Sequence, residues 1–80
     1  MGLFGKKSAL QKHTDLFFAA VKMGQSVEYA MKQAIDNGLT DRVFANRADG
    51  AEKLYAELAP KVEPEDKQAL EKAYNRQKET

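Results

Sequence analysis

The stretch that decides the fold is residues 8–24, SALQKHTDLFFAAVKMG. Ser8 and Gln11 form a capping-box pair at its start, and Gly24 stands where a helix commonly ends. With helical periodicity, the apolar residues between these signals fall on one broad arc, namely Ala9, Leu10, Leu16, Phe17, Ala20, Val21 and Met23. The pattern predicts a helix over residues 8–23 with this arc against a core. Phe18 lies just beyond the edge of the arc, so we expect it either to wrap round the core or to be partly exposed.

A second helix is predicted directly after the first. Ser26 is its expected cap, and the helix should run to Asn37, with Gly38 ending it. Its apolar residues form one clean stripe, made of Val27, Ala30, Met31, Ala34 and Ile35. Tyr29 lies opposite this stripe and is therefore expected at the surface.

The next segment gives two conflicting signals. Asp49 and Glu52 resemble a fresh capping box, which would break the chain before Ala51. Yet the apolar residues keep one helical phase through Gly50, and they are Val43, Phe44, Ala48, Ala51, Leu54, Tyr55 and Leu58. An interior Gly costs only about 1 kcal/mol relative to Ala. We therefore favour one helix over residues 40–59, with Thr40 as its cap and a bend at Gly50.

The last helix is predicted over residues 64–78. Ala59-Pro60 ends the preceding helix, and Pro64 suits a first helical position. Its apolar face is thin, with only Ala69, Leu70, Ala73 and Tyr74, so we expect loose packing. The fold class that follows is an all-α bundle of three or four helices, with the first three segments forming the core. Residues 8–80 would form one helical domain behind a flexible N-terminal arm, residues 1–7.

Composition narrows the function classes. The 80 residues contain no Cys and one His, which excludes a disulfide framework and leaves no ligand set for structural zinc. The longest apolar run, residues 16–21, is far too short for a membrane span, and we expect a cytoplasmic protein. The net charge is only +1, which is not the footprint of a nucleic-acid-binding domain. A chain this small often needs extra support, and a homodimer is one source of it.

No residue pattern indicates catalysis. His13 lies near the centre of the arc on the first predicted helix, where it could be a pH-sensing imidazole in the core. We favour a boundary residue that is hydrogen-bonded or open to solvent, because a second His or any Cys is missing. The clustered carboxylates Glu63, Glu65 and Asp66 are explained by a helix start, where negative charge is favourable. We therefore predict no catalytic, metal-binding or cofactor-binding residues and no enzymatic activity.

The sequence leaves three functional hypotheses. The first is a non-enzymatic protein-interaction or regulatory module that binds a protein partner through an exposed helical face. Its candidate residues are Leu3, Phe4, Phe18, Tyr29 and Tyr74. The weakest of the three is peripheral membrane attachment through Leu3, Phe4, Lys6 and Lys7.

The second hypothesis is a small DNA-binding regulator with a helix-turn-helix-like corner around Gly38. Arg42, Asn46 and Arg47 would then lie on one helix and reach phosphates or base edges. Against it, Gln33, Asn37 and Arg47 occupy positions that are normally apolar in that motif. Asp36 and Asp41 would also face the phosphates.

Overall fold

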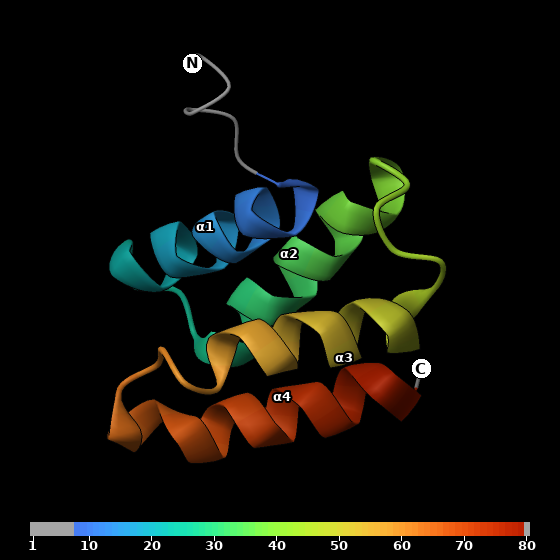
Figure 1. The fold of residues 1–80 in the computed structure, drawn as a ribbon. Helices are drawn as coiled ribbons and strands as arrows, with labels where there is room; N and C mark the ends of the chain where they lie inside the picture. The colour runs from blue at the N-terminus through green and yellow to red at the C-terminus, as the bar shows by residue number, and fades with distance from the viewer. Residues whose placement is uncertain (1–7, 80) are drawn as a thin grey trace.

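The computed structural model describes residues 8–79, which form four α-helices and one short 3-10 helix. In chain order the elements are α1 (Ala9–Lys22), α2 (Val27–Thr40), α3 (Arg47–Leu58), η2 (Pro64–Asp66) and α4 (Lys67–Glu79). Figure 1 shows α1 and α2 as one antiparallel pair and α3 and α4 as a second, with α2 contacting all three other helices. The predicted all-α bundle is confirmed, and the expected N-terminal arm lies outside the described residues.

Serine side chains cap the N-termini of α1 and α2, as the sequence predicts. The Ser8 hydroxyl accepts a hydrogen bond from the Gln11 amide at 3.0 Å, and the Ser26 hydroxyl accepts one from the Tyr29 amide at 3.1 Å. Each bond satisfies one of the amide groups that a helix leaves unpaired in its first turn. Gly24 ends α1 with a φ of 95°, a left-handed conformation that glycine adopts without strain.

The predicted end of α2 at Gly38 is wrong, because the helix continues to Thr40. Its end is a Schellman motif, in which the Val43 amide donates to the Gly38 carbonyl at 2.8 Å and the Arg42 amide to the Leu39 carbonyl at 3.1 Å. The left-handed position of this motif, usually a glycine, is held by Arg42 with a φ of 62°.

The prediction of one bent helix over residues 40–59 is also wrong. A turn over residues 41–46 separates α2 from α3, and Asn46 caps α3 by accepting a hydrogen bond from the Asp49 amide at 2.8 Å. The Asp49 carboxylate in turn accepts from the Ala45 amide at 3.0 Å. Asp49 therefore belongs to the first turn of α3, so a helix start at Asp49 with a break before Ala51 is wrong as well.

Phe44 explains why the two helices share one apolar phase. Its buried ring leaves the turn and enters a slot between Gly38 of α2 and Gly50 of α3. A Cβ atom at position 38 would lie 2.2 Å from Phe44 Cε2, and one at position 50 would lie 2.7 Å from Phe44 Cδ2. Both glycines are therefore packing residues within helices, rather than a helix end and a bend.

The last helix contributes more to the core than its thin apolar face predicts. Leu70 and Ala73 are fully enclosed with the side chains of the other helices. The Tyr74 ring stacks on Tyr55 of α3 at a centroid distance of 4.5 Å. The core therefore draws on all four helices, not only on the first three segments.

The buried face of α1 is rotated relative to the predicted arc. His13, Thr14 and Phe17 are its buried residues, and the arc residues Ala9, Leu16 and Met23 are exposed. His13 and Thr14 can be buried because their polar atoms are hydrogen-bonded. The Thr14 hydroxyl donates to the Gln11 carbonyl at 2.8 Å, for example. This rotation leaves part of the apolar arc at the surface.

Candidate protein-interaction surface

Two of the residues that the rotation exposes, Leu16 and Met23, line a shallow groove between α1 and α2. We call it the α1/α2 groove, and its volume is about 270 Å³. It is lined by Leu16, Ala19, Ala20, Met23, Gln25, Tyr29, Gln33 and Asn37. Its lining comes from α1, from α2 and from the turn between them, and these two helices run antiparallel (Figure 1).

Among the described residues, the large apolar side chains with the highest exposure all line this groove. Leu16 is 40% exposed, Met23 80% and Tyr29 46%. The described residues that line the groove include no Asp, Glu, Lys or Arg. An uncharged apolar hollow of this kind offers contact area without the cost of desolvating a charge.

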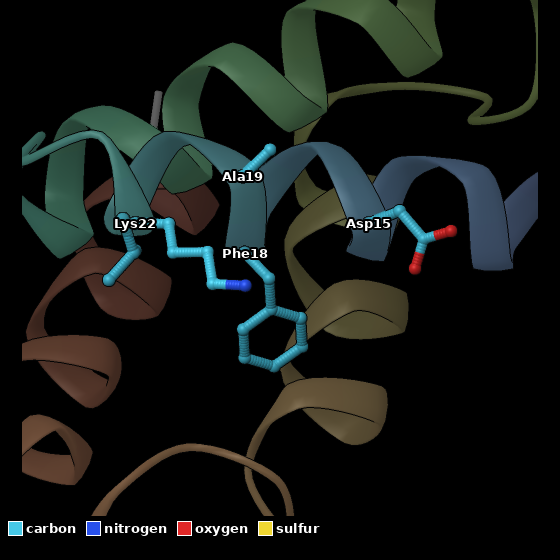
Figure 2. A pocket seen from close by; sticks show the side chains of 5 residues that line it. Asp15, Phe18, Ala19 and Lys22 are labelled. Carbon is cyan, nitrogen blue, oxygen red and sulfur yellow. The ribbon is translucent and has the colours of Figure 1, made fainter.

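A second hollow lies on the opposite side of the α1 ridge and is lined by Asp15, Phe18, Ala19, Val21 and Lys22. Figure 2 shows the Phe18 ring extending away from α1, with the Lys22 side chain bent toward it and Asp15 further along the helix. Phe18 is half-buried, because its ring packs edge-on against Phe17 at a centroid distance of 5.3 Å. Ala19 lines both hollows, so the ridge between them is narrow at that point.

Of the five residues predicted to bind a protein partner, the three that the structure describes do not form one site. Tyr29 lies in the α1/α2 groove, and Phe18 lies in the hollow across the ridge. Tyr74 is half-buried on Tyr55 and carries the Lys78 ammonium 4.7 Å above its ring. Leu3 and Phe4 lie outside the described residues, as do Lys6 and Lys7 of the membrane hypothesis.

The three residues of the DNA-binding hypothesis do not share a helix face. Arg42 lies in the turn after α2, and Asn46 is the cap of α3. Arg47 is engaged within the bundle, donating to Asp36 at 2.6 Å and to Gln77 at 2.8 Å. Burial disfavours the charged form of Asp36, but hydrogen bonds from Arg47 and Lys32 outweigh it and hold the pKa of Asp36 below its ordinary value.

His13 is not the boundary residue that the sequence analysis favours, since it is fully buried. Its Nδ1 donates to the Ala9 carbonyl at 2.7 Å, and its Nε2 lies 3.2 Å from a carboxylate oxygen of Asp41. The ring also lies against Phe44, with centroids 5.8 Å apart. His13 therefore joins α1 to the turn after α2.

Within residues 8–79, no three His, Asp or Glu side chains are arranged to hold a metal ion, and no helix is long and apolar enough to span a bilayer. Comparisons with known protein families, with curated protein sequences and with solved structures find no match.

Leu16 and Met23 are the surface residues that the sequence analysis missed, because it placed them in the core. A signal for them exists in the spacing. Leu16, Ala19 and Met23 follow one another at intervals of three and four residues, which is the repeat of a helix–helix seam. This seam lies at the edge of the predicted arc, on the side away from Phe17.

Proposed function

We propose that this protein is a non-enzymatic protein-interaction module that binds its partner through the α1/α2 groove. The observation that carries the proposal is the gathering of Leu16, Met23 and Tyr29 in one uncharged groove. Contiguous exposed apolar groups mark interaction sites, whereas single exposed apolar residues are ordinary. Tyr and Met are also enriched in the buried centres of protein interfaces.

The shape of the surface favours a helical partner. A helix laid in a groove is held by apolar anchors that recur every three or four residues, and Leu16, Ala19 and Met23 have this spacing. Covering a Leu or Met side chain fully would contribute about 2 kcal/mol. Partial covering of Leu16, Met23 and Tyr29 would therefore give an affinity suited to reversible association.

The other two hypotheses gain less support. Arg47, one of the three residues of the DNA-binding hypothesis, is paired with Asp36. The membrane hypothesis concerns Leu3, Phe4, Lys6 and Lys7, outside the described residues. A cytoplasmic location is part of the proposal, on the sequence grounds given above.

Site-specific photo-crosslinking in cells of the source organism tests the proposal. A photo-reactive amino acid at position 23 or 29 should give a discrete protein adduct. The same amino acid at the exposed position of Glu52, on α3, should not. A Leu16→Ser change should weaken the adduct while leaving the far-ultraviolet circular dichroism unchanged. Equal adducts at positions 23 and 52, or none at 23 and 29, would contradict the proposal.

A further inference from the structure

The outer side of α1 carries a seam suited to packing against another helix. Lys12, Leu16, Ala19 and Met23 are all exposed and are spaced by four, three and four residues. Seven-residue spacing of this kind keeps one stripe facing a partner helix over several turns. The large Leu16 and the small Ala19 adjoin each other along this stripe. A partner seam with the same alternation in reverse order would place each Leu against an Ala.

Charges border this seam on one side only. Asp15 and Lys22 are seven residues apart and both line the hollow beside Ala19, on the side away from α2 (Figure 2). They therefore occupy equivalent edge positions of the seam and carry opposite charges. Asp15 also accepts a hydrogen bond from Gln11 at 3.0 Å, which holds its carboxylate beside the stripe.

We propose that the partner of this face is a second copy of the same chain, packed with its α1 antiparallel to the first. In an antiparallel pair of helices, equivalent edge positions of the two chains face each other. Asp15 of each chain then faces Lys22 of the other, which gives two opposite-charge contacts related by a two-fold axis. The same register places Leu16 against Ala19 and Met23 against the aliphatic stem of Lys12.

A parallel arrangement lacks this complementarity. In a parallel two-fold pair, the edge that carries Asp15 and Lys22 in one copy faces the opposite edge of the seam in the other copy, so neither charge meets an opposite charge. The other edge is uncharged, because the lining that α2 contributes there is Tyr29, Gln33 and Asn37. Charge alone therefore selects the antiparallel two-fold pair. This inference rests on the proposed function, because it names the partner of the same face.

The charge pattern can be tested by reversal and mixing. The full chain has a mass of 9.0 kDa, and sedimentation equilibrium at low ionic strength should show a concentration-dependent rise toward twice that value. Asp15→Lys alone and Lys22→Asp alone should each raise the dimer dissociation constant about tenfold, because both opposite-charge pairs become like-charge pairs. An equimolar mixture of the two variants should associate as tightly as the unmodified chain, since each copy again meets opposite charges.

Glu71→Lys and Lys72→Asp on α4 provide matched charge changes away from the seam and should leave the association unchanged. Ala19→Arg should abolish it while the circular dichroism and thermal midpoint stay close to those of the unmodified chain. Recovery in the mixture would confirm contacts between copies, since contacts within one chain cannot be repaired by mixing.

Two results would overturn the inference. One is a monomer at every concentration. The other is a dimer whose dissociation constant does not change with Asp15→Lys, Lys22→Asp or Ala19→Arg. A monomer that still forms an adduct with a different protein through position 23 would refute the second copy and leave the proposed function standing. Loss of that adduct as well would refute both.

Discussion

The ring of Phe44 lies so close to Gly38 that a Cβ atom at position 38 would sit 2.2 Å from Phe44 Cε2. Gly50 borders the same ring from α3, where an added Cβ would also lie 3.3 Å from Ile35 Cγ2. The two helices can approach around the ring only because neither has a side chain there. This slot fixes the distance between α2 and α3 and anchors the turn that joins them.

Gly38→Ala should destabilise the protein even though Ala is the better helix former. The helix propensity gain is about 1 kcal/mol. The overlap forces a buried ring out of its slot, and overpacking of this kind costs about 1–3 kcal/mol, with the upper end expected at a 2.2 Å contact. Urea unfolding should therefore show a net loss, smaller for Gly50→Ala. Phe44→Leu should recover part of the loss in the Gly38→Ala background, and strict additivity of the two changes would contradict the slot.

Arg42→Gly should stabilise the protein. Arg42 holds a left-handed conformation that costs a non-glycine residue about 1–2 kcal/mol. Part of this gain is offset because glycine gains freedom in the unfolded chain, which leaves about 0.5–1 kcal/mol. Arg42→Ala is the matched control, because it removes the same charge but keeps the Cβ atom. Equal thermal midpoints for the two variants would show that backbone strain is not the cause.

Asp36 should make the stability depend on pH at the acidic end. The pKa of Asp36 is lowered in the folded state, so its ionised form stabilises the fold. This contribution is complete above the ordinary carboxyl pKa of 3.8 and is lost as the pH falls through the lower folded pKa. Since the pair with Arg47 is partly exposed, screening limits it to about 1 kcal/mol.

Asp36→Asn should therefore be less stable than the unmodified chain at pH 7, with the difference closing below pH 3.8. Chemical unfolding at several pH values measures this difference. Glu52→Gln controls for the loss of one exposed carboxylate. A difference between Asp36→Asn and the unmodified chain that persists undiminished at pH 2 would assign the effect to packing rather than to charge.

His13→Ala should cost about 2–4 kcal/mol, because it opens a cavity beside Phe44 and removes a hydrogen-bonded buried group. Asp41→Asn should cost less than about 1 kcal/mol, because the Asp41 side chain is 45% exposed and solvent screens its contact with His13. Thermal unfolding of both variants separates the two contributions. Equal losses would mean that the contact between His13 and Asp41, and not the packing of the ring, holds α1 to the turn.

The features that the sequence predicts well are local ones. Ser8, Ser26 and Pro64 act within three residues of themselves, so their effects on helix starts can be read from neighbouring positions. Tyr29 is likewise placed at the surface by the pattern of its own helix. These signals establish the order of the helices and limit their number to three or four.

The features that the sequence does not predict depend on distant partners. His13 is buried because Asp41, 28 residues away, meets its ring. Its burial, with that of Thr14, turns Leu16 and Met23 outward. Gly38 has the same sequence signature whether it ends a helix or admits an aromatic ring, and only the position of Phe44 decides between them. The candidate site followed from these long-range contacts, so its outline could not be read from helical periodicity alone.

The anchoring of Phe44 has a consequence for how the molecule fluctuates. The amide groups of Val43 and Phe44 both donate to the Gly38 carbonyl, and the ring that follows them is held in the slot. A surface turn usually exchanges its amide hydrogens rapidly through small local openings. Here the opening requires the ring to leave the core, so deuterium should enter these two positions about as slowly as it enters the middle of α2. The turn and the two helices it joins should behave as one cooperative unit on the timescale of hydrogen exchange.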